Sequence, residues 1–219
     1  MNILVINSGS SSIKFQLIQM PETRVLASGV VERIGIENGS ISYKTETADF
    51  SEKVDFKDHS EGLQKVANLL MSAEIGVIKN AAEVDAVGHR VVHGGKQFTK
   101  TIKVNDEVKA NIKRLFSLAP LHNPANLTGI EVAEKLFEDT PQVCVFDTAF
   151  FESVPQKAYQ YAIPQHLMEE SRIRAYGFHG TSHKYVSKKA LNHLDDPYAK
   201  IITIHLGNGC SMTAIKDGK

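Results

Sequence analysis

The sequence predicts an α/β fold that opens with an antiparallel meander and repeats its opening hairpin near the end. Three observations lead to this prediction. Strand-like runs separated by turn residues extend from residue 3 to residue 45. Candidate buried strands then alternate with segments of helical period. Finally, a strand, a Gly-rich turn and a second strand close the sequence in the pattern that begins it.

The opening meander consists of four strand candidates rich in β-branched and aromatic residues. They cover residues 3–6, 13–18, 24–35 and 40–45. A Gly/Ser turn separates the first two, and the turn-forming pair Asn38-Gly39 separates the last two. Because short turns join antiparallel neighbours, consecutive strands are expected to pair with one another.

Helical periodicity begins after the meander, with apolar residues recurring three and four positions apart. Leu63, Val66, Ala67 and Leu70 mark one helix, Val108, Ile112, Leu115 and Phe116 a second, Leu127, Ile130, Ala133, Leu136 and Phe137 a third, and Val186, Ala190 and Leu194 one face of a fourth over residues 182–194. Asn105 is the expected N-cap of the second helix, and Pro120 follows it. Residues 85–92 and 143–147 are expected to form buried strands between these helices.

The closing segment repeats the first hairpin when Gly209 is placed over Gly9. Leu206 then falls on Ile6, Ser211 on Ser11 and Ile215 on Phe15. One interpretation is a chance likeness of two hairpins. The other is a duplicated domain, with a first domain at 1–150 and an incomplete second one at 151–219.

The duplication predicts that the chain is truncated, because its second copy has only begun at residue 219. The apolar residues of the second hairpin would then lack packing partners; they are Ile201, Ile204, Leu206, Met212 and Ile215. We therefore expect the isolated chain to leave its last ~70 residues mobile or to self-associate through this edge.

Composition excludes several classes of protein. With 25 Lys and Arg against 25 Asp and Glu, the chain lacks the basic excess typical of nucleic-acid binders. Its apolar runs fall short of the roughly 18 residues that a membrane helix needs. The start, MNILVINSGS, has no basic region before its apolar stretch, and two cysteines do not make a disulfide scaffold. A cytoplasmic globular protein is expected.

Both hairpin turns are candidate phosphate loops. NSGSSS at residues 7–12 and LGNGCS at residues 206–211 consist of small polar residues, although neither completes a common nucleotide-binding motif. Successive small residues in a tight turn can direct backbone N–H groups toward an anion. Ser10 and Ser12 add hydroxyl donors, Lys14 adds a positive charge, and Asn7 lies where its strand ends. The alternative is a pair of ordinary solvated turns.

Histidine pairs occur twice at a spacing of four, as His89 with His93 and His179 with His183. On one helix this spacing would favour zinc. The first pair is expected on a strand, where four residues span about 13 Å. Gly-Thr-Ser separates the second pair and is expected to interrupt a helix. Neither pair therefore predicts a zinc site. His179 is a candidate charge stabiliser, or else a histidine that ties a loop.

Arg90 and Asp147 are further candidates. An arginine beside a Gly-Gly turn can bind a carboxylate or phosphate in a bidentate manner, or can form a surface ion pair. Asp147 ends a predicted buried strand, and ligands gather at the carboxyl ends of strands in open α/β sheets. It can equally cap a helix or begin a turn.

Six segments occur here in the order found in acetate kinases: NSGSSSIKF, GHRVVHGG, LAPLHNPAN, VFDTAFF, AYGFHGTSH and HLGNGCS. The sequence therefore resembles the acetate kinase family, within the superfamily of acetate and sugar kinases, Hsp70 and actin. The resemblance implies an α/β, RNase H-like (actin-like ATPase) fold with a βββαβαβα core, followed by the start of a duplicated second domain.

The resemblance also implies an activity and residue roles. The activity is reversible transfer of the ATP γ-phosphoryl group to acetate with Mg²⁺ or Mn²⁺, giving acetyl phosphate and ADP. The implied catalytic residues are Asp147, His179 and Arg90, with Asn7 near the metal. Implied nucleotide contacts are Ser10, Ser12, Lys14, His205, Leu206, Gly207, Asn208 and Gly209, and implied substrate contacts are Arg90, Val92, Leu121, Phe178 and His122. A homodimer without nucleic-acid or membrane partners is implied as well.

Family members continue well beyond this length, and a second arginine, a late metal-side glutamate and an adenosine pocket are expected in that later sequence. We therefore expect this chain to bind ATP weakly and to be poorly active alone. Two alternatives to an acetate kinase remain. One is a propionate or butyrate kinase, because the same motifs serve longer acids. The other is a nucleotide-binding switch module without a small-molecule acceptor.

Overall fold

The computed structural model describes residues 1–207 and 209–219 and contains two compact units. Unit 1 comprises Met1–His93 and Thr101–Val145, and unit 2 comprises Gly94–Lys100 and Phe146–Lys219. Each unit is described separately below. The domain boundary expected at residue 150 stays a prediction.

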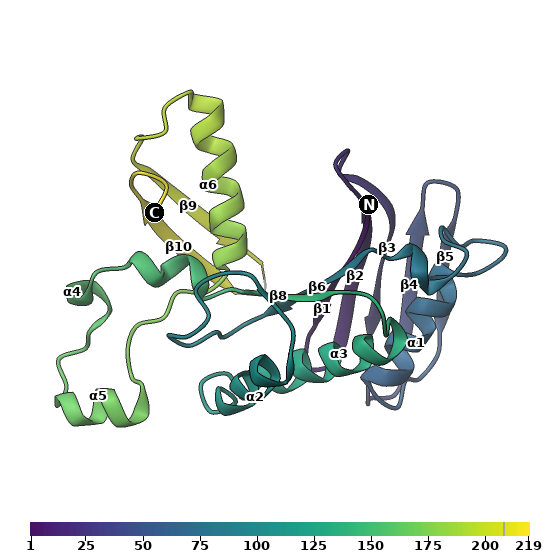
Figure 1. Ribbon diagram of the computed structural model, residues 1–219, viewed down its shortest axis with the longest axis horizontal. Helices are drawn as coiled ribbons and strands as arrows, with labels where there is room; N and C mark the ends of the chain where they lie inside the picture. Colours follow the sequence, from purple (N-terminus) through teal and green to yellow (C-terminus); the bar gives the residue numbers. More distant parts are fainter. Residues whose placement is uncertain (208) are drawn as a thin grey trace. The chain divides into compact units, whose positions relative to one another are not determined.

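Unit 1 is built on an eight-stranded sheet with the strand order β5-β4-β3-β2-β1-β6-β8-β7 (Figure 1). The strands are β1 (Asn2–Ser8), β2 (Ser12–Gln19), β3 (Arg24–Glu32), β4 (Ser40–Thr45), β5 (Asp49–Lys53), β6 (Ala86–Val91), β7 (Ile102–Lys103) and β8 (Gln142–Phe146). The first five pair consecutively and antiparallel, so the predicted meander is confirmed, with β5 as an unexpected addition. β6 pairs parallel to β1 in the middle of the sheet.

The central strands form a buried face because apolar residues alternate along them. Leu4 and Ile6 on β1, and Ile13, Phe15 and Leu17 on β2, are all at most 3% exposed. The residues between them point to the opposite face. Each fully buried side chain of this size contributes about 1.5–3 kcal/mol to folding.

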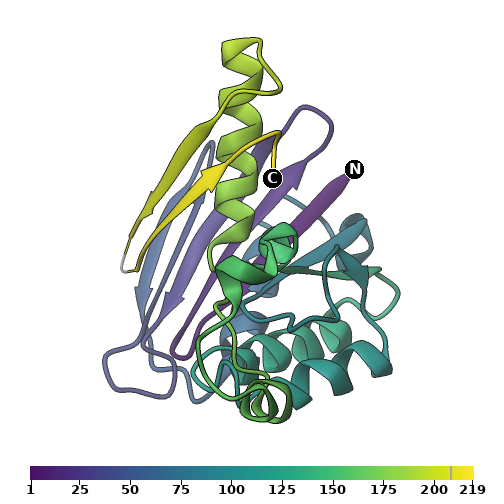
Figure 2. The ribbon, with the colours of Figure 1, turned by 90° about the vertical axis from the view of Figure 1, so that its left-hand side faces the viewer.

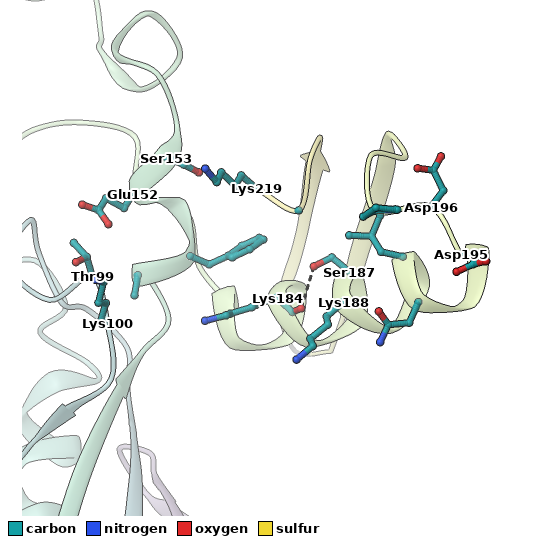
Figure 3. A pocket seen from close by; sticks show the side chains of 16 residues that line it. Thr99, Lys100, Glu152, Ser153, Lys184, Ser187, Lys188, Asp195, Asp196 and Lys219 are labelled. Atoms are coloured by element: carbon teal, nitrogen blue, oxygen red, sulfur yellow. Dashed lines mark hydrogen bonds between the residues drawn. The ribbon is translucent and has the colours of Figure 1, made fainter.

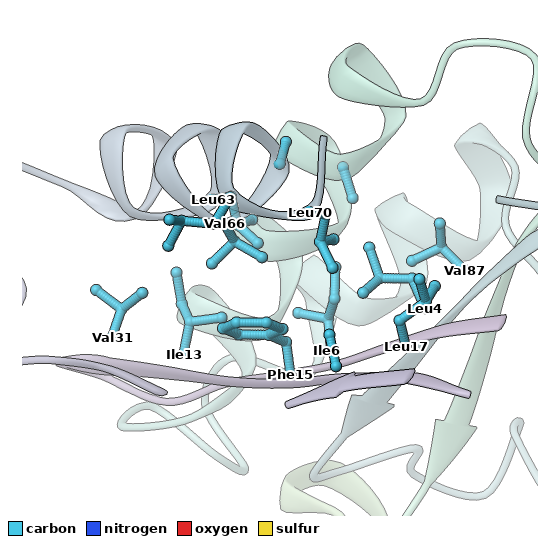
Figure 4. Packing of buried hydrophobic residues seen from close by; sticks show 14 of the residues in the cluster. Leu4, Ile6, Ile13, Phe15, Leu17, Val31, Leu63, Val66, Leu70 and Val87 are labelled. Carbon is cyan, nitrogen blue, oxygen red and sulfur yellow. The ribbon is translucent and has the colours of Figure 1, made fainter. Parts of the chain in front are cut away.

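Three helices follow the meander in unit 1: α1 (His59–Leu70), α2 (Asp106–Arg114) and α3 (Asn123–Leu136). The predicted face of α1 is confirmed, since Leu63, Val66 and Leu70 are buried against the central strands (Figure 4). Asn105 caps α2 as expected, its Oδ1 accepting a hydrogen bond from the Val108 N–H at 2.8 Å. The meander, helices and parallel strand together confirm the predicted α/β class.

Unit 2 contains mostly short helices and one hairpin. Its elements are η2 (Ala149–Ser153), α4 (Gln156–Tyr159), α5 (Gln165–Ser171), α6 (Gly180–Leu194), β9 (Ile201–Leu206) and β10 (Cys210–Ile215). The two strands form an antiparallel sheet, and α6 runs alongside it (Figure 2). None of the helices in the described ranges is both long and apolar enough to cross a membrane.

Helix α6 differs from its prediction at its start and in its buried face. It begins at Gly180, so the segment Gly-Thr-Ser lies inside the helix and does not interrupt it. The expected apolar face is also wrong, because Val186 and Leu194 are 46% and 55% exposed while His183 and Ser187 are buried. His183 instead faces the hairpin, where its ring nitrogens bond Thr203 and Ser211.

The second hairpin exposes most of the apolar residues for which no packing partner was expected. Ile204, Leu206 and Met212 are 57%, 77% and 70% exposed. Ile215 differs from this expectation, since it is 2% exposed. Side chains alternate between the two faces of a strand, and Ile215 is on the less exposed face of β10, the face toward α6.

Both predicted hairpins form, but with different turns. The closing pair of the first is Ser8–Ile13, whereas Leu206–Cys210 closes the second, with one residue fewer between the paired residues. As a result, Asn7 is part of a strand while its counterpart Gly207 lies beyond the end of β9.

Candidate active site

The predicted site residues divide between the two units. Asn7, Ser10, Ser12, Lys14, Arg90, Val92, Leu121 and His122 lie in unit 1, and Asp147, Phe178, His179, His205, Leu206, Gly207 and Gly209 lie in unit 2. Asn208 lies outside the described residues. Each group is described within its own unit.

Asn7 and Arg90 are brought together by the parallel pairing of β1 with β6. Ile6 and His89 are register partners, so the residues that follow them lie side by side. The Arg90 Nη1 donates a hydrogen bond to the Asn7 Oδ1 at 3.1 Å. Arg90 is half-buried and therefore less hydrated than a surface arginine. A cation held at the end of a central strand is suited to bind an anion.

The NSGSSS turn lies next to this pair. Lys14 is the register partner of Asn7 on β2, so Asn7 lies on the middle strand between the strands that carry Lys14 and Arg90. The turn closes with a 2.7 Å hydrogen bond from the Gly9 N–H to the Ser12 carbonyl. His59 braces it from α1, with its Nε2 2.7 Å from the Gly9 carbonyl oxygen. Ser10 is exposed and Ser12 half-buried, so both hydroxyls are near the surface.

Two asparagines on α3, neither predicted from the sequence, hold the ends of these strands. The Asn126 Oδ1 accepts from the Val92 N–H at 3.0 Å, and its Nδ2 donates to the Ser8 carbonyl at 2.6 Å. Asn123 exchanges two 3.0 Å hydrogen bonds with the His93 backbone. The only local signal was their spacing of three, which places both on one helix face.

The residues expected to line the acetate pocket are not enclosed within unit 1. Val92 is buried, but Leu121 is 73% exposed. His122 is exposed and precedes α3 without making a side-chain cap. Phe178, the remaining member, belongs to unit 2 and is 37% exposed. A closed pocket formed by these residues therefore stays a prediction.

Two buried histidines flank Arg90 on the same segment. Burial is the main cause that lowers the pKa of His89; its 2.6 Å hydrogen bond to Gln142 and the charge of Glu134 act in the opposite direction. His93 is 1% exposed, and burial lowers its pKa to about 4. Both rings are therefore neutral at pH 7, which leaves Arg90 as the cation of this segment.

Unit 1 should lose stability as the pH falls from about 6.5 toward about 4. In that range an unfolded histidine binds a proton while folded His93 remains neutral, so protonation favours the unfolded state. Each such histidine lowers the free energy of unfolding by about 1.4 kcal/mol per pH unit. Urea unfolding across this range measures the slope. His93→Gln should flatten it; a slope identical to that of the unchanged protein would contradict the prediction.

In unit 2, the start of α6 is fastened to Asp147. Asp147 is 1% exposed. The Gly180 N–H donates to its backbone carbonyl at 3.0 Å, and the Thr181 Oγ1 donates to its Oδ1 at 3.2 Å. The expected position of Asp147 at the end of a buried strand is thus observed. The helix N-terminus also faces this carboxylate, which is the favourable orientation for a negative charge.

Substituting Gly180 should disturb this arrangement. A methyl group at Gly180 would collide with the Asp147 carbonyl oxygen. We expect Gly180→Ala to move the helix start and to destabilise unit 2 by about 1–3 kcal/mol. Thermal unfolding measures the effect. Gly207→Ala is the matched control, because a methyl group there meets its nearest neighbour at 3.6 Å. Equal melting temperatures for both variants would argue against the contact.

His179 lies in a cluster of polar side chains between α6 and the hairpin. Its backbone has a φ of 57°, a strained conformation for a residue other than glycine. Its ring stacks on that of His205 with centroids 4.1 Å apart, and its Nδ1 is 2.8 Å from the Ser211 Oγ. The Nδ1 of His205 is 3.0 Å from the Ser182 Oγ. Several functional groups thus fix the position of His179.

The second candidate phosphate loop lies beside His179. The Gly207 N–H donates to the Gly209 carbonyl at 3.0 Å. A methyl group at Gly209 would lie 3.3 Å from the His179 Cε1, so the loop backbone passes close to that ring. Leu206 is 77% exposed and points away from the cluster. Within unit 2, the structure therefore brings His179, His205 and the loop together.

A large cavity in unit 2 does not coincide with these residues. It has a volume of about 760 Å³, and its lining includes Lys100, Lys184, Lys188, Asp195 and Asp196 (Figure 3). None of the predicted site residues that the structure describes lines it. We therefore assign the candidate site to the polar and charged residues at the strand ends and not to this cavity.

Comparison with solved structures places the fold among known kinases. A crystal structure of Porphyromonas gingivalis acetate kinase matches with a TM-score of 0.93 and 42% identity, covering 100% of this chain and 55% of that one. A propionate kinase from Francisella tularensis matches with a TM-score of 0.93, 41% identity and the same coverage. The predicted actin-like ATPase fold is thereby confirmed.

Sequence comparison identifies the family. The model of the acetokinase family matches residues 2–219. The acetate kinase of Flavobacterium johnsoniae is 58% identical over 219 residues, which are 100% of this chain and 55% of that protein. The chain belongs to the acetokinase family. It spans about half the length of the curated relatives it matches.

Proposed function

We propose that this protein is an acetate kinase, which transfers the γ-phosphoryl group of ATP reversibly to acetate. The observation that carries the proposal is the family match over residues 2–219, which includes all six motif segments. The geometry supports it, because each unit places anion-binding groups at the ends of its strands.

In the proposed reaction an acetate oxygen attacks the γ-phosphorus. The new O–P bond forms as the bond to the β,γ-bridging oxygen breaks, and ADP leaves with that electron pair. Since carboxylate is already a competent nucleophile, no general base is required. Phosphoryl transfer of this kind depends on positioning and charge neutralisation. Arg90 and Lys14 would offset the repulsion between the two anionic reactants, and His179 would stabilise charge on the transferring group.

The oxygen ligands present fit a hard divalent cation such as Mg²⁺. In unit 2 Asp147 offers a buried carboxylate. In unit 1 Asn7 offers an amide oxygen, which also accepts the hydrogen bond from Arg90. In the described parts of the chain no group of three or more His, Cys, Asp or Glu residues could hold a metal ion. Mg²⁺ is commonly held by one or two protein ligands together with phosphate oxygens and water. When bound, the ion would neutralise charge on the phosphates.

Asp147→Asn tests the metal assignment. The substitution is nearly isosteric, and Asn can still accept from Thr181, so folding should be retained. Loss of the negative charge should raise the Mg²⁺ concentration for half-maximal turnover about 10-fold or more. The measurement is turnover against Mg²⁺ concentration in an active protein that contains this chain, with a melting curve as the folding control. An unchanged Mg²⁺ dependence would show that Asp147 is structural.

Acetyl phosphate formation tests the proposed function. It can be assayed on this chain alone and on a chimaera that continues it with the remaining C-terminal part of the Flavobacterium johnsoniae relative. We expect acetate-dependent turnover from the chimaera and little from the chain alone. A chimaera that binds ATP but shows no dependence on acetate would contradict the proposal and favour a nucleotide-binding switch module.

Propionate is the second candidate acceptor, because one matching structure is that of a propionate kinase. One methylene group changes discrimination by only about 1–3 kcal/mol, so the ratio of kcat/KM for acetate and propionate must decide. A ratio in favour of propionate would reassign the substrate and leave the reaction class intact. The expected homodimer, the cytoplasmic location and the absence of nucleic-acid or membrane partners stay predictions.

A further inference from the structure

A buried histidine in unit 2 has no role in the chemistry described so far. His183 lies on α6 and is 1% exposed. Its Nδ1 is 2.7 Å from the Oγ1 of Thr203 on β9, and its Nε2 is 2.8 Å from the Oγ of Ser211 on β10. Its ring contacts Phe151 edge-on, with centroids 5.9 Å apart. Both ring nitrogens are therefore engaged.

Ser211 connects this buried ring to His179. Its hydroxyl lies 2.8 Å from the His183 Nε2 and 2.8 Å from the His179 Nδ1. A hydroxyl carries a single hydrogen, so it donates to one of these nitrogens and accepts from the other. The direction of this bond therefore determines whether the Nδ1 of His179 carries a proton.

The His183 Nε2 sets that direction: a protonated Nε2 donates to Ser211, which then donates to the His179 Nδ1, whereas an unprotonated Nε2 accepts from Ser211, which then accepts from His179. Burial, followed by the nearby His205 and His179, lowers its pKa. A neutral ring has one N–H donor and one acceptor nitrogen, so it makes one hydrogen bond of each kind. A cationic ring would donate from both nitrogens. A chain of hydrogen bonds therefore runs from Thr203 to His183, from His183 to Ser211 and from Ser211 to His179.

We propose that Ser211 and His183 are positioning residues for His179, whose Nδ1 they bind so that the ring is held in one tautomer. Its Nε2 is then the nitrogen that meets the transferring phosphoryl group. The role of the Nε2 rests on the proposed phosphoryl transfer, whereas the fixed tautomer of His179 does not. A single defined tautomer at a strained backbone position is what a pre-organised charge stabiliser requires.

The test is the tautomer of His179 in the chimaera that continues this chain with the C-terminal part of the relative, labelled with ¹⁵N-histidine and measured by long-range ¹H–¹⁵N correlation near neutral pH. We expect one tautomer in the unchanged chimaera. Ser211→Ala should change the tautomer population of His179, and Ser211→Thr should restore the single form because it retains the hydroxyl. His183→Phe keeps the aromatic contact with Phe151 but removes both nitrogens, and should also change that population.

Ser182→Ala is the matched control, because its hydroxyl bonds His205 in the same cluster and not His179. It should leave the His179 tautomer unchanged. A tautomer mixture in the unchanged chimaera, no change in Ser211→Ala, or equal changes in Ser211→Ala and Ser182→Ala would each overturn the proposal. Acetate-dependent turnover is a separate measurement. A protein without that turnover could still show the single His179 tautomer, and a protein with that turnover could lack it.

Discussion

Replacing Arg90 with alanine is expected to remove most of the turnover of an active protein that contains this chain. Arg90 is held beside Asn7 at the end of β6, within the strand pairing of the central sheet. A pre-organised cation of this kind contributes about 2–4 kcal/mol to transition-state stabilisation, which is roughly a 30- to 1,000-fold change in kcat/KM. Arg90→Lys should recover little, because lysine lacks the planar fork that binds two oxygens at once.

Arg24→Ala is the matched control for this measurement. Arg24 lies on β3 of the same sheet and pairs with Glu46, with side chains 60% and 74% exposed. Exposed ion pairs contribute about 0–1 kcal/mol, so this variant should retain its turnover and stability. Steady-state kinetics in the chimaera compares the variants. Near-normal kcat/KM for Arg90→Ala would remove Arg90 from the site.

The features that follow from local sequence were predicted well. The turn residues and alternation of the first 45 positions gave the antiparallel order of β1 to β4, and Asn105 was correctly identified as a helix cap. These patterns depend on a few neighbouring residues, so they are visible without the fold. The same logic fails for α4, which has only 4 residues and no complete period.

The predicted face of α6 shows how tertiary context overrides periodicity. Val186, Ala190 and Leu194 form an apolar stripe, but the helix packs on a hairpin face that carries Thr203 and Ser211. The buried contact therefore includes polar side chains, and Val186 and Leu194 remain largely exposed. Which face of the hairpin meets the helix depends on strand register, which the helix sequence does not encode.

The candidate site was predicted as separate residues and not as contacts. Asn7 was placed at the end of a strand and Arg90 beside a Gly-Gly turn, but their hydrogen bond depends on β6 pairing with β1, and they are 83 residues apart in sequence. Asn126 and Ser8 are separated by 118 residues. A polar side chain in a helix can bond to solvent or to any neighbouring element, so only the fold reveals which backbone group it satisfies.

Removing the Asn126 side chain should give a large loss of stability in unit 1. The side chain satisfies two buried backbone groups, the Val92 N–H and the Ser8 carbonyl, at the ends of two different strands. Helix α3 also packs so tightly here that a methyl group at Gly129 would collide with the Ser8 hydroxyl. Asn126→Ala would leave both groups without their partner, at about 1–3 kcal/mol each.

We therefore expect Asn126→Ala to lower the free energy of unfolding by about 2–6 kcal/mol, measured by urea denaturation. Asn68→Ala is the matched control, because Asn68 is an exposed asparagine on α1 whose Oδ1 accepts a hydrogen bond from Gln64. Its effect should stay within about 0.5 kcal/mol. Asn126→Asp should be intermediate, since it keeps the acceptor for Val92 and loses the donor to Ser8. If Asn126→Ala is no less stable than Asn68→Ala, Asn126 does not hold these strand ends in solution.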